Sequence, residues 1–114
     1  MKLKELVEKF DLQIQCAADR LEREIKGGYV SDLLSDVIAN GRAGDVWITL
    51  QIHQNIVGVA SLKDLAAIII INGRQPEENT IEKAKNEGIP IMVSKMCAFE
   101  LVGRLYNAGI SGTR

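Results

Sequence analysis

The residues best suited to chemistry in this sequence are one histidine, His53, and two cysteines, Cys16 and Cys97. Metal sites usually take three or four His, Cys or carboxylate ligands, so a single histidine cannot build a histidine cage. Two cysteines so far apart in the sequence form neither a zinc ribbon nor a CxxC redox pair. No spacing here indicates a His–Cys nucleophile pair, which depends on hydrogen-bond geometry. We therefore expect no catalytic residue, no metal and no cofactor.

Sequence motifs for phosphate and acyl chemistry are also missing. The sequence contains no GxxxxGK[ST] phosphate loop and no GxGxxG dinucleotide fingerprint. It also lacks the GxSxG nucleophile elbow. No pair of carboxylates stands in a recognisable motif for acid–base catalysis. These observations predict that the protein is not an enzyme.

The charge balance and the apolar runs bear on partners and location. Fourteen basic and fifteen acidic residues leave a formal net charge of −1, without the basic excess typical of nucleic-acid binding. Residues 1–10 interleave Lys and Glu with apolar side chains, unlike a signal peptide. The longest apolar run, residues 65–71, is shorter than the roughly 18 residues of a membrane span. We expect a cytoplasmic protein that binds neither nucleic acid nor a membrane.

The length and composition fit one globular domain. The chain has 114 residues, of which 46% are hydrophobic and 25% are charged, the proportions of an ordinary folded domain. We place a single domain at residues 1–109 and a flexible tail at residues 110–114.

The second half of the chain alternates strands with helices. The expected elements, in order, are at residues 46–52, 53–64, 67–71, 76–88, 89–93 and 96–107. Crossover connections of this kind yield parallel strands with helices on the sheet faces. Four consecutive isoleucines at residues 68–71 are typical of a central strand covered on both faces. The sequence predicts an α/β fold with a mostly parallel sheet.

The first third adds elements whose pairing the sequence does not settle. Residues 3–10 predict an amphipathic helix. Residues 11–16 predict a strand near a sheet edge, with Leu12, Ile14 and Cys16 on one side. Residues 24–30 predict a strand in which Gly27-Gly28 marks a bulge or a close approach to the backbone. The helix that follows should bury a stripe of four residues, Leu33, Leu34, Val37 and Ile38.

The helix at residues 53–64 points to self-association. Its apolar residues at positions 56, 57, 59, 60 and 62 leave almost no polar face, which is typical of a helix covered on most sides. A symmetric dimer is the commonest way to cover surplus apolar surface. We therefore expect a homodimer.

Polar residues recur where the predicted parallel strands end. In open parallel sheets ligands bind beyond the carboxyl ends of the strands, so these residues form a candidate ligand-binding edge. The candidates are Ser31, Asp32, Thr49, Gln51, His53, Asn55, Asn72, Gly73, Arg74, Ser94 and Lys95. Arg74 and Lys95 are the expected anion contacts. The alternative is structural, because Ser31 or Asp32 also suits a helix cap and Asn72-Gly73 suits a turn.

Four stretches of the chain resemble the DRTGG domain family. They are REIKGGYVSDLLSDVIA (residues 23–39), WITLQIHQNIVGVA (residues 47–60), IIIINGR (residues 68–74) and FELVGRL (residues 99–105). The resemblance rests on their order and extends over roughly residues 1–109. The family's namesake pentapeptide is not intact, since only Gly27-Gly28 follows Glu24-Ile25-Lys26.

The resemblance implies a fold similar to the N-terminal domain of HPr kinase/phosphatase and, more distantly, of the Mur ligases. Such domains accompany phosphotransacetylases and pyrophosphatases with CBS modules, as regulatory or assembly modules. We therefore expect a non-catalytic regulatory or assembly module that senses a small anionic or nucleotide-like ligand. Two alternatives stay open: a small enzyme or phosphotransfer partner that uses His53, and a structural partner subunit of a metabolic enzyme, such as one in redox or hydrogenase metabolism.

Overall fold

The computed structural model describes residues 1–112 and is built around one five-stranded sheet. The strands lie in the order β1-β5-β4-β3-β2. Strands β2 to β5 run parallel, and β1 pairs antiparallel with β5 at one edge. Their bounds are β1 Gln13–Cys16, β2 Gly27–Val30, β3 Asp45–Thr49, β4 Ala67–Ile70 and β5 Ile91–Val93. The predicted mostly parallel α/β fold is confirmed, and the isoleucine-rich strand β4 lies at its centre.

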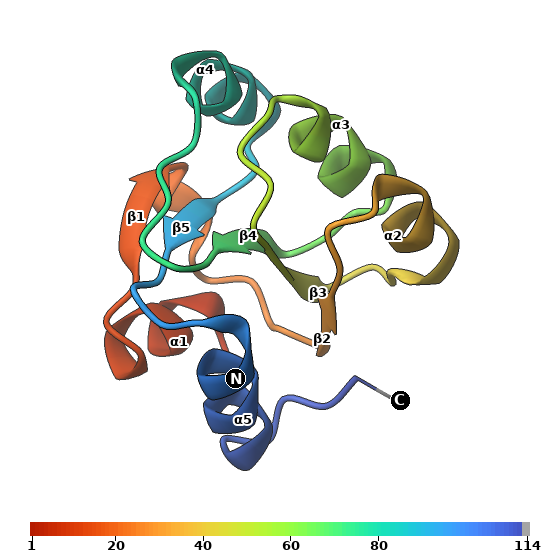
Figure 1. The fold of residues 1–114 in the computed structure, drawn as a ribbon. Helices are drawn as coiled ribbons and strands as arrows, with labels where there is room; N and C mark the ends of the chain where they lie inside the picture. The colour runs from red at the N-terminus through yellow and green to blue at the C-terminus, as the bar shows by residue number, and fades with distance from the viewer. Residues whose placement is uncertain (113–114) are drawn as a thin grey trace.

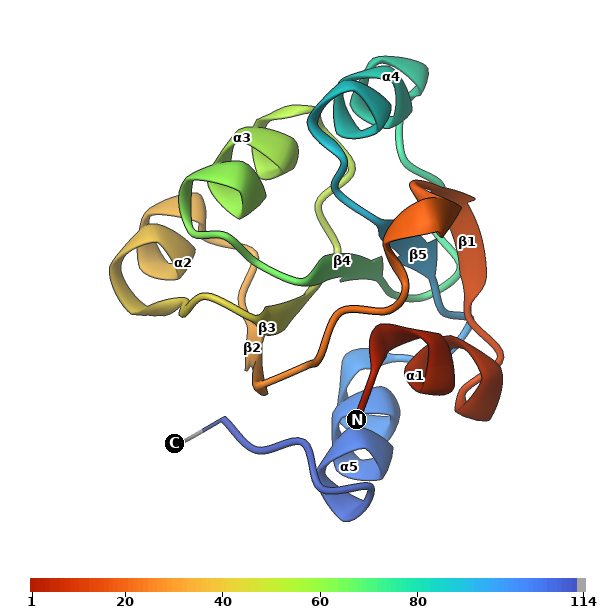
Figure 2. The same cartoon turned by 180° about the vertical axis from the view of Figure 1, so that it is seen from behind.

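Helices cover both faces of the sheet. Helices α2, α3 and α4 lie on one face, and α1 and α5 lie on the other (Figures 1 and 2). Their bounds are α1 Leu3–Lys9, α2 Leu34–Asn40, α3 Asn55–Leu62, α4 Glu78–Glu87 and α5 Ala98–Asn107. A short 3-10 helix, Ala18–Arg20, lies in the connection between β1 and β2. Pro76, predicted to open α4, lies just before its N-cap Glu77, and α4 ends as predicted at Gly88, with φ +68°.

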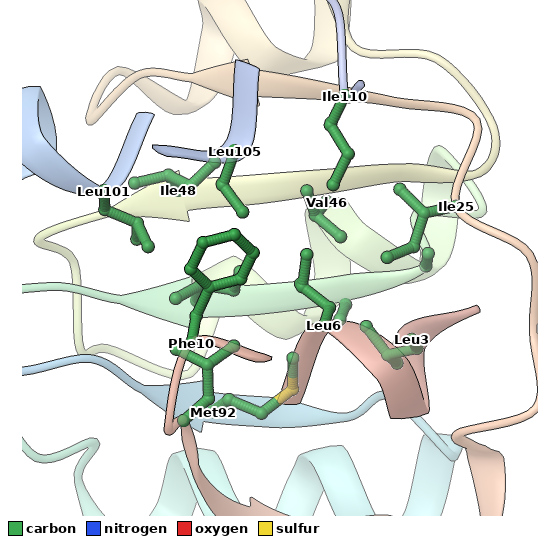
Figure 3. Packing of buried hydrophobic residues seen from close by; sticks show 14 of the residues in the cluster. Leu3, Leu6, Phe10, Ile25, Val46, Ile48, Met92, Leu101, Leu105 and Ile110 are labelled. Carbon is green, nitrogen blue, oxygen red and sulfur yellow. The ribbon is translucent and has the colours of Figure 1, made fainter. Parts of the chain in front are cut away.

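Alternation along the strands divides the core into two clusters. Val46, Ile48, Ile69 and Met92 pack with α1 and α5 (Figure 3). Their strand neighbours point to the opposite face and pack with α2, α3 and α4, and these include Trp47, Ile68, Ile70, Ile91 and Val93. Successive strand side chains point to opposite faces, so both faces of the central strands are apolar. This two-sided burial explains why their sequences lack polar alternation.

The edge strand β1 departs from the predicted pattern. Ile14 pairs with Met92, whereas Cys16 pairs with Ile91, and the register shifts between Ile14 and Cys16. Such a bulge inserts one extra residue and reverses the side-chain alternation beyond it. Ile14 therefore lies partly exposed at the edge, and Cys16 is buried with the α2–α4 side of the core. The prediction that Ile14 and Cys16 share one buried side was wrong.

Two helices are less buried than their sequences indicate. In α3, Ile56, Val57, Val59 and Ala60 are buried between the sheet, α2 and α4, but Leu62 is 70% exposed. The chain itself therefore covers the apolar side of α3, and this helix does not require a second copy. The predicted stripe of α2 is also narrower, since Val37 is buried whereas Leu33 and Ile38 are exposed. Helix α2 lies at one end of its layer, with α3 on one side of it only (Figure 1).

The segment after α5 is attached to the domain through residue 112. Ile110 is buried in the α1–α5 cluster, and the Gly28 N–H donates to the Ser111 carbonyl at 3.1 Å. A Cβ on Gly28 would lie 3.4 Å from Ile110 Cγ2, so the close backbone approach predicted at this glycine is present. Residues 110 and 111 therefore pack against the domain, and the domain boundary at residue 109 stays a prediction. Residues 113 and 114 of the predicted tail lie outside the described residues.

Candidate ligand-binding edge

The parallel strands bring their carboxyl ends to one edge of the sheet. Thr49 is the last residue of β3, and the other candidates follow β2, β3, β4 or β5 in the chain. The edge consists of the loops after β2 and β3 and the loops after β4 and β5, which adjoin because β3 pairs with β4 at the middle of the sheet. The hydrogen bonds within each part show which side chains hold the loops.

Asp32 ties the end of β2 to the end of β3. Its Oδ1 accepts hydrogen bonds from Thr49 Oγ1 at 2.8 Å and from the Leu50 N–H at 2.7 Å. Gln51 adds a return contact, because its Nε2 donates to the Asp32 carbonyl at 2.9 Å. Asp32 therefore bridges two loops and does not cap a helix, which corrects one of the alternatives drawn from the sequence. One oxygen of the Asp32 carboxylate, Oδ1, is therefore already used in hydrogen bonds within the protein.

Ser31 holds the start of α2. Its Oγ accepts from the N–H of Leu33, the N-cap of α2, at 3.1 Å. The carbonyl of Ser31 accepts from the indole Nε1–H of the buried Trp47 at 2.8 Å. Ser31 therefore forms a local turn two residues before the N-cap, and it is not itself the helix cap that the sequence offered as an alternative.

The loops after β4 and β5 are hydrogen-bonded to each other. The Gly73 N–H donates to the Ser94 carbonyl at 2.8 Å, and the Asn72 N–H donates to the Met96 carbonyl at 2.9 Å. Ser94 Oγ, which is buried, accepts from the Met96 N–H at 3.1 Å. Asn72 and Gly73 both have positive φ, 58° and 66°, a conformation that Asn and Gly adopt most readily. The predicted Asn-Gly turn is therefore present, and it holds two neighbouring strand ends at fixed positions.

Two cationic side chains flank this pair of loops. Arg74 follows Gly73 and donates from Nη1 to the Leu50 carbonyl at 2.6 Å, which uses one of the five N–H donors of its guanidinium. Lys95 follows Ser94 and is exposed. Within residues 1–112, its ammonium has no hydrogen-bond or ion-pair partner. Both cations retain donors that face no protein acceptor.

His53 stands apart from this network. It is exposed just before α3, and its Nδ1 accepts from the Asn55 N–H at 3.1 Å. Across the part of the chain that the structure describes, no carboxylate or thiol is hydrogen-bonded to the ring. The structure therefore places His53 and Asn55 together at the start of α3 but connects neither to Asp32, Arg74 or Lys95.

The two thiols differ in their surroundings. Cys97 is exposed at the N-cap of α5. Cys16 is buried, and its Sγ donates to the Ile89 carbonyl at 3.4 Å. Burial raises the pKa of the Cys16 thiol, which disfavours the reactive thiolate. Neither cysteine lies in a hydrogen-bonded pair with His53.

Sequence reasoning missed a polar cluster between β2 and α2. The Tyr29 hydroxyl lies 2.8 Å from both carboxylate oxygens of Asp36, and Asn40 Nδ2 donates to Asp36 Oδ1 at 2.9 Å. The hydrogen bond from Tyr29 is the main cause that lowers the pKa of Asp36, and the same bond raises the pKa of Tyr29. The i, i+4 spacing of Asp36 and Asn40 was the available signal. Leu50 and Met96 also form hydrogen bonds at the carboxyl edge, but through main-chain N–H and carbonyl groups. Every residue type has these groups, so the sequence could not indicate which would be used.

The opposite edge of the sheet carries a cavity of about 410 Å³ whose charges are largely paired within the protein. Arg23 Nη1 lies 3.0 Å from Asp64 Oδ1, and Arg23 Nη2 donates to the Asp64 carbonyl at 2.9 Å. The cavity walls also carry Asp19, Glu22 and Glu87. This excess of carboxylates makes the opposite edge a poor place for an anion.

Residues 1–112 contain neither a metal-binding cluster nor a membrane-spanning helix. No group of three or more His, Cys, Asp or Glu side chains there is placed to hold a metal ion. No helix in that part of the chain is both long enough and apolar enough to cross a membrane.

The chain is similar to a known protein in structure but not in sequence. No family model matches the chain, and no curated protein matches it by sequence. Among solved structures, the chain is similar to the CBS and DRTGG domains of the regulatory region of Clostridium perfringens pyrophosphatase, which was solved with its activator, diadenosine tetraphosphate. The TM-score is 0.71 at 17% sequence identity, and the match covers 89% of this chain and 44% of that one. The fold is DRTGG-like. The chain thus spans less than half of a regulatory region that also contains CBS domains, and at this identity the likeness establishes the fold alone.

Proposed function

We propose that this DRTGG-like domain is a non-catalytic regulatory module that binds a small anionic, nucleotide-like ligand at the carboxyl edge of its sheet. The observation that carries the proposal is the hydrogen bond from Gly73 to Ser94, which places Arg74 and Lys95 at two adjacent strand ends. The similar pyrophosphatase region is regulatory and was solved with a nucleotide activator, which favours a nucleotide over other anions.

The chemistry of the two cations suits phosphate groups. A guanidinium presents several donors in a planar fork that matches two phosphate oxygens, and an ammonium supplies a compact charge. Arg74 is oriented by its bond to the Leu50 carbonyl, so part of the ordering cost of binding is met before a ligand arrives. Asn72 and Gln51 lie at the same edge and have amide groups suited to hydrogen bonds with a base or ribose.

A regulatory role fits this site better than a catalytic one. The carboxylate of the edge, Asp32, is engaged by Thr49 and Leu50 on one oxygen. His53 has no side-chain partner to activate it within the described residues. Acid–base or nucleophilic catalysis usually requires a base held within hydrogen-bond reach of its nucleophile. We therefore rank binding above the alternative in which His53 carries out phosphotransfer.

Isothermal titration calorimetry tests the proposal directly. Diadenosine tetraphosphate, ATP, AMP and inorganic pyrophosphate are each titrated into the protein, and we expect saturable binding of at least one nucleotide. A ligand at 100 times its dissociation constant should raise the free energy of unfolding by about 2.7 kcal/mol. The double variant Arg74→Gln/Lys95→Gln should weaken that binding at least tenfold.

A charge-matched control separates the edge from general attraction. The double variant Lys26→Gln/Arg42→Gln removes two positive charges at exposed positions beside the start of β2 and β3, away from the carboxyl ends. It should bind the nucleotide as the natural protein does. Equal weakening by both double variants would contradict a site at Arg74 and Lys95, and the absence of binding to every compound in the panel would contradict the sensing function. If only pyrophosphate binds saturably, the proposed anion site stands, but the proposal that its ligand is a nucleotide is contradicted.

A further inference from the structure

Helix α5 carries two apolar stripes, and the sheet covers only one of them. Leu101 and Leu105 are buried in the α1–α5 cluster, with Ala98 and Ala108 packed against it (Figure 3). The second stripe consists of Phe99, Val102, Gly103 and Tyr106, which follow the i, i+3, i+4, i+7 spacing of a single helix face. Phe99 is 91% exposed and Tyr106 is 66% exposed.

The exposed stripe continues onto the edge strand. Val30, the exposed last residue of β2, lines the same shallow groove as Phe99, Val102 and Tyr106. Isolated exposed apolar residues are ordinary, but a contiguous patch with two aromatic rings marks an interaction surface. The chain has few aromatic residues, 4% of the total, so two of them on one exposed helix face make this surface unusual within the molecule.

The polar flank of this stripe is self-complementary in charge. Glu100 and Arg104 lie one turn apart on the same side of α5, and Arg104 Nη2 is 3.1 Å from Glu100 Oε1. Both side chains are more than half exposed, so each keeps donors or acceptors for a partner. A surface that carries one acidic and one basic residue on one flank can pair with a copy of itself turned end for end.

The positions of the four stripe residues fit the same symmetry. A two-fold axis between Val102 and Gly103 would set Phe99 opposite the partner's Tyr106 and Val102 opposite the partner's Gly103. No atom lies within 4 Å of a Cβ built on Gly103, so this position has room to receive a side chain. Glu100 would then lie one residue, about 1.5 Å along the axis, from the level of the partner's Arg104.

We propose that the exposed stripe of α5 is the interface of a symmetric dimer, in which two α5 helices pack antiparallel. The occupant of the groove is a second copy of this chain because the aromatic residues, the Gly103 gap and the charged flank all match under one two-fold rotation. This interface goes beyond the proposed ligand binding and does not depend on it, since Arg74 and Lys95 follow other strands on the carboxyl edge. The proposed interface on α5 also takes the place of α3, the helix through which the sequence predicted a homodimer.

The size of the patch is compatible with a dimer. A standard interface buries roughly 800 Å² on each partner, and an aromatic side chain contributes about 150–250 Å² when buried. Phe99 and Tyr106 together would supply several hundred Å², and Val30, Val102 and the flanking charged residues would add the rest. Aromatic residues also dominate the affinity of many interfaces.

Multi-angle light scattering and sedimentation velocity on the full chain test the proposal. We expect a mass of twice the 12.5 kDa of the chain at micromolar concentration. Phe99→Ala and Tyr106→Ala should each raise the dimer dissociation constant by roughly 100-fold, because each dimer loses two aromatic contacts. The matched control is Leu62→Ala, since Leu62 is 70% exposed but lies at the end of α3; it should change the dissociation constant less than about threefold.

Charge reversal tests the two-fold arrangement itself. In the proposed dimer, residue 100 of each copy faces residue 104 of the other. Glu100→Arg therefore sets two arginines against each other at both contacts, and Arg104→Glu sets two glutamates against each other. Each variant alone should raise the dimer dissociation constant by about tenfold. A 1:1 mixture of the two variants should form a heterodimer, because every facing pair is then of opposite charge. The double variant Glu100→Arg/Arg104→Glu should dimerise like the natural chain.

Several results would overturn the proposal. A monomeric mass at 100 μM would do so, as would a dimer that tolerates both Phe99→Ala and Tyr106→Ala. A mixture of the charge-reversed variants that associates no better than either variant alone would exclude the antiparallel arrangement. Nucleotide binding in the dimer-weakened variants is measured in parallel, so the failure of this proposal is distinguishable from failure of the ligand site. The melting temperature of each variant confirms that the exposed substitutions leave the fold intact.

Discussion

Removing the Asp32 carboxylate should loosen the carboxyl edge of the sheet by a measurable amount. Asp32→Ala deletes the acceptor of two short hydrogen bonds, 2.8 Å from Thr49 Oγ1 and 2.7 Å from the Leu50 N–H. A hydrogen bond to a charged acceptor contributes about 1.5–3 kcal/mol to the free energy of unfolding when it is shielded from water. Asp32 is exposed, so water can form some of the lost hydrogen bonds in the variant and reduce this contribution. We therefore expect about 1 kcal/mol for each bond and about 2 kcal/mol in total.

Urea denaturation followed by tryptophan fluorescence measures this loss. Trp47 is the only tryptophan in the sequence and is fully buried in the native state, so its emission reports global unfolding. For a chain of this size the expected loss corresponds to a melting temperature lower by about 8 °C. The slope of free energy against urea should stay unchanged, because the substitution does not alter the area exposed on unfolding.

Three further variants isolate the cause of the loss. Asp32→Asn retains an oxygen acceptor and should lose less than half as much stability as Asp32→Ala. Thr49→Val removes one donor, and a double-mutant cycle with Asp32→Ala should give a coupling of about 1 kcal/mol. Asp19→Ala is the control, because Asp19 is exposed on the 3-10 helix, and it should change stability by less than about 0.5 kcal/mol. The reasoning is refuted if Asp32→Ala is as stable as Asp19→Ala, or if the coupling with Thr49 is zero.

Two other predictions concern titratable groups. Ellman's reagent should label the exposed Cys97 rapidly and Cys16 only on unfolding, because Cys16 is buried and its thiol pKa is raised; equal labelling rates in the native protein would contradict this burial. Tyr29→Phe removes the hydrogen bond that lowers the pKa of Asp36 and raises that of Tyr29, so it should destabilise the protein at pH 7. That difference should disappear as the pH falls through the lowered Asp36 pKa, and also as it rises through the raised Tyr29 pKa, because the bond needs an ionised carboxyl and a protonated phenol; a difference that persists at both extremes of pH would show another cause.

The centre of the sheet was the most predictable part of the fold. Residues 68–71 lack any polar alternation, and a short apolar run between turn signals leaves few options other than a strand covered on both faces. The alternation of strands and helices after residue 46 then predicted parallel pairing. The edge strand β1 was harder, because the bulge between Ile14 and Cys16 changes which face each side chain occupies. A one-residue shift of register leaves no mark in composition.

The helices show how an apolar pattern can be assigned to the wrong neighbour. The apolar residues of α3 predicted a helix that a second copy of the chain must cover, but α2 and α4 of the same chain flank it. Helix α5 has two apolar stripes, and Tyr106, which lies in the second, is 66% exposed. Hydrophobic periodicity identifies a stripe but does not say whether a sheet or a second molecule covers it.

The candidate edge was predictable in position and not in detail. Parallel topology places the residues after each strand at one edge, which is why Asp32, Arg74 and Lys95 lie on it. Their partners depend on loop conformation, and several of them are main-chain groups, such as the N–H and carbonyl of Leu50. Such groups are present in every residue, so sequence patterns carry no information about which of them will be used.

The measurement that tests the regulatory account most directly is a nuclear magnetic resonance titration of the ¹⁵N-labelled protein with diadenosine tetraphosphate. The account predicts saturable shifts of backbone amides that concentrate at residues 72–74 and 94–96, where two strand ends are hydrogen-bonded together. In the Arg74→Gln/Lys95→Gln variant the same shifts should need at least ten times more nucleotide to reach half of their full size. Saturable shifts that concentrate instead around Arg23 and Asp64 at the opposite edge, or a spectrum unchanged at millimolar nucleotide, would contradict it.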